Sequence, residues 1–212
     1  MTPRHHPSDA LLVDYAAGAL TTGPRLVVAS HLNACPHCAR GLALAEAVGG
    51  VVLSDLPPAE MRPDALDLAL ARIERPESPP ATSAGLPQDW IKVPAEVLAS
   101  LRARGRRSAF GAWISPVTKG PGRARTYLIG MAPGRGVARH THAGYELTCV
   151  LKGSFIDGGI VYGPGDFTEH DGDMTHAPQA TDEDCVCLMA TEAPLVPSDW
   201  VGRLVFPLLG VS

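Results

Sequence analysis

The stretch Gly134–Gly153, GRGVARHTHAGYELTCVLKG, decides how the second half of this chain folds. It holds His140, His142 and Glu146 at short, fixed spacing between two glycines. Two residues separated by one project from the same face of a β-strand, and a short turn after His142 brings Glu146 back to the same point. Two imidazoles and a carboxylate leave coordination positions open, as catalytic zinc and non-haem iron sites do. The stretch therefore predicts a metal site in a β-domain.

These positions match the pattern G-x5-H-x-H-x3-E-x6-G, in which the chain resembles the cupin barrels. The second cupin motif, G-D-x4-P-x-G-x2-H, is partly kept, because Gly165 and Asp166 match and His176 stands at the expected position. The resemblance covers roughly residues 90–212. It implies a divalent metal, which zinc, iron, manganese or nickel would satisfy. The expected ligands are His140, His142, Glu146 and His176. His170 is expected at the surface.

Short alternating apolar runs, separated by Gly, Pro and Asp, surround this site. Short strands with frequent turns are typical of an all-β sandwich or barrel. A short helix predicted near Ala95–Arg104 is an exception to this pattern of short strands. The predicted strands include Thr126–Met131, Leu147–Leu151, Gly159–Tyr162 and Cys185–Ala190.

The chain has five cysteines, an odd number that argues against a disulfide framework and for metal or redox chemistry. Cys185 and Cys187 alternate with apolar residues, so both sulfurs should face one side of a strand. Their Cα atoms would lie about 6.6 Å apart with parallel Cβ vectors, which is poor geometry for a disulfide. The pair is interpreted either as small core residues or as reactive thiols in the barrel.

The first 75 residues show helical periodicity. Ser8 is suited to cap the first helix, and Pro36 suits the first turn of the third. The four predicted helices run from Ser8 to about Gly18–Thr22, from about Leu26 toward Cys35, from Pro36 to Gly49–Gly50, and over Pro63–Arg75.

His31, Cys35 and Cys38 stand at positions i, i+4 and i+7, a spacing that lets the three side chains converge. Thiolate and imidazole are the preferred ligands of a tetrahedral structural zinc, which needs a fourth donor. The nearest suitable donors outside the motif are His5 and His6. The spacing therefore predicts a zinc site in the helical region.

The segments MTPRHHPSDALL, YAAGAL and HLNACPHC resemble the ChrR-type zinc-binding anti-sigma factors, in which an anti-sigma domain is joined to a cupin. This resemblance implies that His6 is the fourth zinc ligand. It implies that the helical region binds and occludes an extracytoplasmic-function sigma factor. It also implies that the cupin receives singlet oxygen or organic hydroperoxides as signals. The helix Pro63–Arg75 would pack on the sigma factor, although its stripe of Leu66, Leu70 and Ile73 suits an internal core equally well.

We therefore predict an α+β multidomain protein. A small helical zinc-binding anti-sigma bundle over 1–75 is followed by a Pro- and Ser-rich linker over 76–88 and an all-β cupin (jelly-roll) barrel over 89–212. The net charge of −4 without a basic block excludes direct nucleic-acid binding. No apolar run reaches the roughly 18 residues of a membrane helix. The polar, His-rich start is unlike a secretory signal, which predicts a cytoplasmic protein.

A second hypothesis is a metal-dependent, dioxygenase-like cupin enzyme with a helical accessory domain, because an open metal site can activate oxygen or water. Tyr145 and Glu169 would be its available polar side chains. An enzyme has little reason to carry the HxxxCxxC motif, so we favour a regulator and assign no catalytic residues.

Overall fold

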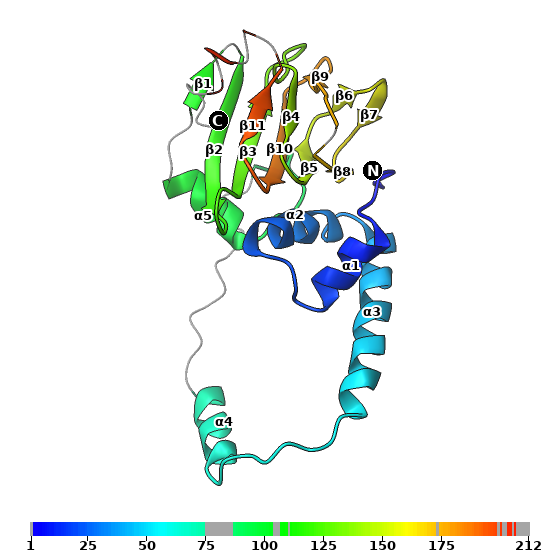
Figure 1. Ribbon diagram of the computed structural model, residues 1–212, viewed down its shortest axis with the longest axis vertical. Helices are drawn as coiled ribbons and strands as arrows, with labels where there is room; N and C mark the ends of the chain where they lie inside the picture. Colours follow the sequence, from blue (N-terminus) through cyan, green and yellow to red (C-terminus); the bar gives the residue numbers. More distant parts are fainter. Residues whose placement is uncertain are drawn as a thin grey trace.

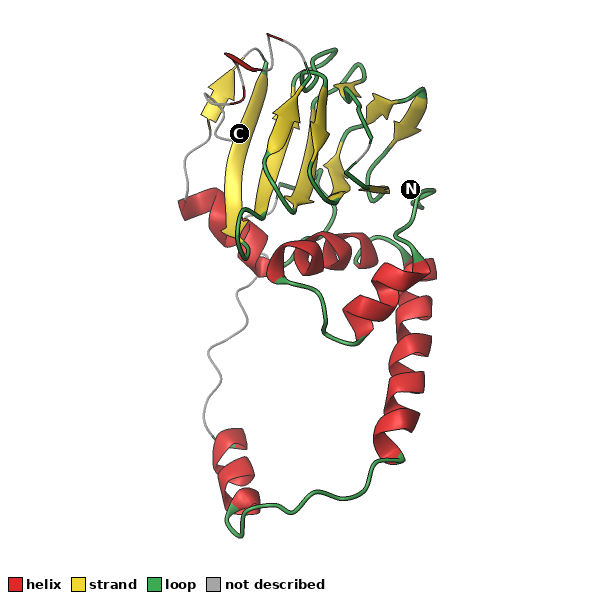
Figure 2. Cartoon of the chain, viewed as in Figure 1, coloured by secondary structure: helices red, strands yellow, loops and turns green. Residues whose placement is uncertain are grey.

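The computed structural model describes residues 2–74, 87–103, 107–109, 111–172, 174–198, 200, 203–204 and 206. Most of the predicted linker 76–88 lies outside the described residues. A helical region comes first and a β-rich region second, as the sequence predicts (Figures 1 and 2). The described helices are α1 (Asp9–Ala16), α2 (Thr22–Leu32), α3 (Pro36–Ser54), α4 (Ala65–Ile73) and α5 (Ala95–Ala103).

The β-region consists of antiparallel strands in three sheets. The largest has the order β1-β2-β3-β10-β5-β8, and the smaller ones have the orders β11-β4 and β7-β6-β9. The strands are β1 (Arg107–Ala109), β2 (Ala112–Lys119), β3 (Arg125–Met131), β4 (His140–His142), β5 (Glu146–Lys152), β6 (Phe155–Asp157), β7 (Ile160–Tyr162), β8 (Phe167–His170), β9 (Gln179–Ala180), β10 (Cys185–Thr191) and β11 (Leu195–Pro197).

The large sheet is buried on both faces, and alternate residues of its strands serve two different cores. On β10, Cys185, Cys187 and Met189 join the barrel interior with Ile129, Phe155 and Phe206. Val186, Leu188 and Ala190 face the opposite way. Because side chains alternate along a strand, the same strand shapes the metal cavity and anchors the helices.

Helix α2 packs on the outer face of this sheet, so the helical region and the barrel share one core. Leu26, Val27 and Val28 of α2 are almost fully buried in a cluster with Leu147 and Leu188 of the sheet. Helix α5 covers β2 on the same face (Figure 1). The sheet therefore supplies part of the core of the helical region.

The helix boundaries confirm most of the predicted signals. Ser8 caps α1, since its hydroxyl accepts a hydrogen bond from the backbone N–H of Leu11 at 3.3 Å. Pro36 lies in the first turn of α3. The predicted stop at Gly49–Gly50 is wrong, because α3 continues to Ser54. Glycine inside a helix costs about 1 kcal/mol relative to alanine, which does not by itself end a helix.

The second half of α3 and all of α4 extend away from the rest of the protein (Figure 1). Their apolar side chains are solvent-exposed: Leu70 is 49% exposed, Leu66 69% and Ile73 79%. Within the described residues, the apolar stripe of α4 therefore does not pack into an internal core. Among these residues, no helix combines the length and apolarity needed to cross a bilayer.

Candidate metal centres

The first cluster of metal-binding side chains lies at the turn between α2 and α3. Ligand atoms of His6, His31, Cys35 and Cys38 all lie within 4.8 Å of one another. The Nδ1 of His6 is 3.4 Å from each of the two sulfurs. Because α2 ends at Leu32 and α3 begins at Pro36, the spacing forms a helix-turn-helix rather than one helix face.

The imidazole of His31 fits a metal at this position. Its Nδ1 donates a hydrogen bond to the carbonyl of Gly165 at 2.6 Å. That bond fixes the tautomer and leaves Nε2 with a free lone pair. The Nε2 atom is buried and has no hydrogen-bond partner among the described residues. A buried, unpartnered acceptor beside two thiols is suited to bind a cation.

The thiol of Cys38 must lose its proton before it binds a metal. Burial, together with the neighbouring Cys35, raises the pKa of Cys38 to about 12. The Sγ of Cys35 accepts from the backbone N–H of Cys38 at 3.5 Å and so caps α3. Metal binding here therefore displaces a proton at neutral pH.

The two other nearby histidines are placed elsewhere. His5 forms an ion pair with Asp166, its Nδ1 lying 3.3 Å from the carboxylate. His37 is exposed, and its ring lies 5.3 Å from that of His6 without joining the four-residue group. Spacing alone left His5 and His6 as alternatives, and the structure puts His6 in the cluster.

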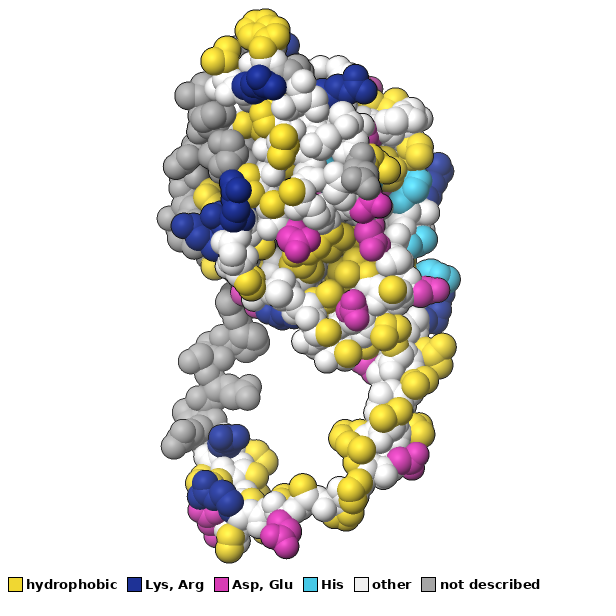
Figure 3. Space-filling model, viewed as in Figure 1, with side chains coloured by type: hydrophobic (Ala, Val, Ile, Leu, Met, Phe, Trp, Pro, Cys, Tyr) yellow, Lys and Arg dark blue, Asp and Glu magenta, His cyan; other side chains and the backbone are white. Residues whose placement is uncertain are grey.

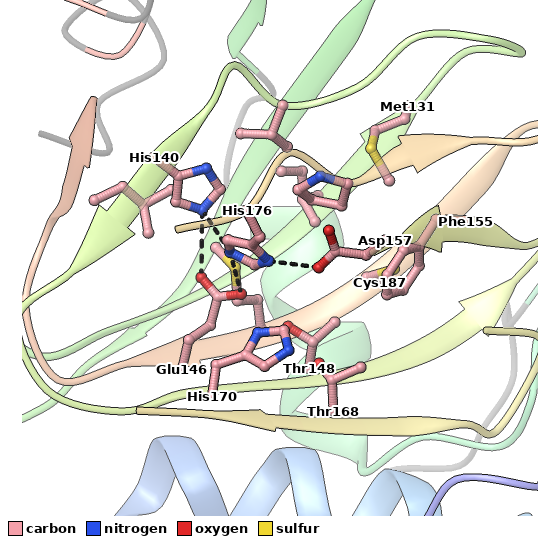
Figure 4. A pocket seen from close by; sticks show the side chains of 15 residues that line it. Met131, His140, Glu146, Thr148, Phe155, Asp157, Thr168, His170, His176 and Cys187 are labelled. Carbon is pink, nitrogen blue, oxygen red and sulfur yellow. Dashed lines mark hydrogen bonds and ion pairs between the residues drawn. The ribbon is translucent and has the colours of Figure 1, made fainter. Parts of the chain in front are cut away.

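The second cluster lies inside the barrel, where His140, His142, Glu146 and His176 also bring their ligand atoms within 4.8 Å. Figure 4 shows three of them converging. The Nε2 of His176 lies 3.1 Å from that of His140 and 3.2 Å from that of His142. Imidazole nitrogens that face one another at this distance need a shared proton or a cation between them. All four residues are buried.

Backbone and carboxylate partners hold these rings in place. The Nδ1 of His140 donates to the carbonyl of Ala138 at 2.8 Å, and the Nδ1 of His176 lies 2.7 Å from Asp157. A β-bridge pairs His140 with His176, so the two residues lie side by side although the second motif is altered. Such outer partners direct Nε2 toward a metal. Asp157 was not predicted, because its position carries no motif.

The electrostatics also suit a cation. Burial alone would raise the pKa of the Glu146 carboxyl, but the surrounding histidines, His140 first, hold it below its ordinary value. Burial lowers the pKa of His142. For His176, the hydrogen bond with Asp157 outweighs burial and raises the pKa. The ionised Glu146 and the neutral His142 are in the forms that bind metal, whereas His176 must lose its proton first.

His170 is not at the surface as predicted. It is 9% exposed and lines the same interior cavity, of about 30 Å³, as Glu146 and His176 (Figure 4). The polar residues around His170 resemble a loop in the sequence. In the structure His170 is the last residue of β8, and the alternation of side chains along this strand turns Thr168 and His170 inward. Asp157, His170 and His176 form a further group of metal-binding side chains.

The cysteine pair lies on the inner face of β10, as alternation predicts. Both residues are buried, and their sulfurs are 3.7 Å apart and unbonded. The contact with Cys185, and then burial, raises the pKa of Cys187 well above its ordinary value. A protonated thiol is a weak nucleophile, which favours the interpretation as core residues.

The polar side chains considered for an enzyme face away from the cupin cluster. Tyr145 packs against the shared core on the helical side. Glu169 accepts hydrogen bonds from the backbone N–H and the hydroxyl of Ser8. Neither side chain is placed to take part in chemistry at the interior cluster.

Comparisons with known proteins agree with both parts of this architecture. A family model described as ChrR Cupin-like domain matches residues 105–195, and one described as Putative zinc-finger matches residues 8–39. The donor sets and the second family together support bound metal.

The chain is 34% identical to the anti-sigma-E factor ChrR of Cereibacter sphaeroides over 213 residues, covering 100% of both chains. A crystal structure of Rhodobacter sphaeroides SigE in complex with the anti-sigma ChrR matches with a TM-score of 0.76 at 34% identity. The match covers 90% of this chain and 100% of that one. The relative is a regulatory protein and not an enzyme. This chain therefore belongs to the ChrR-type anti-sigma factors, which join a zinc-finger-like helical region to a cupin-like domain.

Proposed function

We propose that this protein sequesters an extracytoplasmic-function sigma factor through its zinc-containing helical region, and that its metal-binding cupin domain is needed for release under oxidative stress. The inducing species would be singlet oxygen or an organic hydroperoxide. The assigned domains are 1–75 for sigma binding, 76–88 as linker and 89–212 as cupin. The protein would act in the cytoplasm, where its partner transcribes.

We assign the metal ligands by their chemistry. His6, with the thiolates and imidazole of the α2–α3 turn, would hold a closed, structural zinc. The cupin residues His140, His142, Glu146 and His176 would hold zinc, iron, manganese or nickel, because imidazole and carboxylate suit each of these. When bound, that metal supplies an open coordination position at which an oxidant can react. The protein's own residues orient the imidazoles and keep the site inside the barrel.

The exposed apolar surface of α3 and α4 supports the sigma-binding role most directly. Soluble proteins rarely expose large contiguous apolar patches unless a partner covers them. On α3, Leu44, Val48 and Val51 follow helical spacing and are each more than half exposed. Figure 3 shows apolar side chains along both limbs, facing an open space between them. We call the exposed apolar side chains of α3 and α4 the partner surface, comprising Leu44, Val48, Val51, Val52, Leu53, Leu66, Leu68, Leu70 and Ile73.

The test is binding of the full-length protein to the sigma factor of its own host, measured by calorimetry. The double variant Leu66→Asp, Leu70→Asp should weaken binding by a factor of about thirty or more, since truncated hot spots cost about 2 kcal/mol or more. Its melting temperature should not change, because both side chains are exposed. The matched control is Val161→Asp, an exposed apolar residue of the barrel. Unchanged binding in the double variant would contradict this assignment.

Release is tested separately from binding. His142→Ala should empty the cupin site but leave sequestration intact, so that a sigma-dependent reporter stays repressed when a singlet-oxygen generator is applied. Normal induction in a variant whose cupin is confirmed empty would remove the sensor role. The competing enzyme hypothesis predicts lost turnover of a small molecule and no effect on the reporter.

A further inference from the structure

The turn that precedes β8 in the cupin lies directly against the N-terminal metal cluster. Its Gly165 carbonyl accepts the buried hydrogen bond from His31 at 2.6 Å. Gly165 has a φ of +88°, and a Cβ there would lie 2.8 Å from Pro3 and 3.0 Å from Ala34. Only glycine combines that backbone conformation with so close an approach. The cupin turn is therefore shaped to reach a metal-binding histidine of the other domain.

The next residue of the turn fixes the segment that carries His6. The Asp166 carboxylate is buried and accepts from the backbone N–H of Arg4 at 2.5 Å and of His5 at 3.0 Å. The backbone N–H of Phe167 donates to the carbonyl of His5 at 3.1 Å. These three bonds order the chain just before His6, so two of the four donors in the cluster are oriented by the cupin.

Strand β8 continues from this turn and separates the two metal clusters. On its helical side, the Phe167 ring meets the His31 ring edge-on at 5.7 Å. On its barrel side, Thr168 and His170 line the interior cavity. His170 is also the register partner of Glu146 on β5. This four-residue strand thus contacts His31 on one face and, through the His170 ring, the ring of His176 on the other.

We propose that the Gly165–Asp166 turn and β8 are positioning elements of the N-terminal metal site, and that they couple its metal retention to the state of the cupin cluster. A shift of β8 away from the helices would lengthen the Gly165 bond to His31 and loosen the segment before His6. This inference rests on the proposed function, because it takes the N-terminal cluster to be a metal site. Outer partners of metal-binding histidines typically affect affinity or activity by about 10–100-fold.

The experiment uses full-length protein loaded with cobalt(II) and challenged with excess chelator. Of the metal-binding groups found in the described part of the chain, the N-terminal cluster alone has thiolates among its donors, so its thiolate-to-cobalt charge-transfer band reports that site. Gly165→Ala should release this cobalt about tenfold faster than the unaltered protein and shift the band, because His31 loses its orienting carbonyl. The matched control is Gly122→Ala, which has the same left-handed backbone but nothing within 4 Å of the added Cβ.

Retention of the cupin metal in each variant checks that the barrel remains folded. If Gly165→Ala does not fold, Asp166→Ala is the second variant, since it removes the oxygen that accepts from the backbone N–H groups of Arg4 and His5. It should release cobalt several-fold faster. A release rate and band unchanged from the unaltered protein in a folded variant would overturn the positioning role.

The coupling is tested by emptying the cupin with Glu146→Gln. This change should also speed release from the thiolate site, and the effect should shrink when Gly165→Ala is already present, since interacting residues are non-additive. Independent, additive effects or no effect of Glu146→Gln would overturn the coupling. Sigma-factor binding is measured apart from these rates. Failure of the unaltered protein to bind its sigma factor would overturn the proposed function and leave this result standing.

Discussion

The N-terminal cluster and the cupin cluster each gather four donors, but they differ in donor chemistry and in surroundings. The first has two thiols, lies at a helix-turn-helix and includes the exposed His6. The second has no sulfur donor, lies wholly inside the barrel and borders a cavity. A closed thiolate site suits a structural metal. A site of imidazoles and a carboxylate beside a cavity leaves a coordination position open to an exchangeable ligand. Each prediction below changes one side of this contrast.

The largest expected effect comes from the thiols. Cys38→Ser should remove one metal ion per chain and abolish sigma-factor binding, because the α2–α3 turn loses the cation that holds it. His176→Ala should also remove one ion but leave sigma-factor binding within about twofold, because the N-terminal cluster keeps all four of its own donors. Metal analysis combined with calorimetry on both variants checks this. Loss of both ions in either variant would show that the two sites are not separate.

The helices also differ in how they contribute to stability. Leu26→Ala in α2 should lower the free energy of unfolding by about 2–5 kcal/mol, because it leaves a cavity in the core that the helix shares with the sheet. Val48→Ala in α3 should change it by less than about 0.5 kcal/mol, since that side chain is 58% exposed. Denaturant titration measures both. A large effect at Val48 would mean that the partner surface is packed within the chain.

Asp157→Asn tests the outer support of the cupin cluster. The amide keeps the size of the carboxylate but loses the charge that holds His176, so metal affinity at this site should fall about 10–100-fold. The thiolate site should weaken much less in the same variant, because the coupling across β8 reaches it only indirectly. Competition against a chelator of known affinity separates the two. Equal weakening at both sites would indicate a general loss of fold.

A change of pH should affect the metal affinities of the two sites differently, by a smaller factor than the substitutions above. Zinc must displace the Cys38 proton, whose pKa is raised to about 12, so affinity at the N-terminal site should fall at least about tenfold for each pH unit lost between 8.5 and 7. The cupin site should depend less on pH in this range. Burial keeps His142 neutral and the histidines keep Glu146 ionised, whereas His176, whose pKa is raised, loses a proton on binding metal. A steeper dependence at the cupin site would contradict these protonation states.

The sequence predicted the parts that depend on local pattern. Ser8, Pro36 and the strand alternation around Cys185 depend on neighbours in the chain, and the structure places them as expected. The alternation on β8 turned His170 inward, but its polar neighbours concealed the strand. The contact between His31 and Gly165 joins residues 134 apart, and no spacing rule connects them. For the same reason, the core shared by α2 and the sheet was not predictable.

Helix α3 is capped by Cys35 of the N-terminal cluster and ends in the partner surface, so it can act as a lever arm. Its 19 residues span about 28 Å at a rise of about 1.5 Å per residue. A tilt of about 10° at the Cys35 end would therefore move the far end by about 5 Å, close to one helical turn. A displacement of that size would take its apolar side chains out of register with a surface fitted to them. The cluster at its base need only rearrange slightly to produce it.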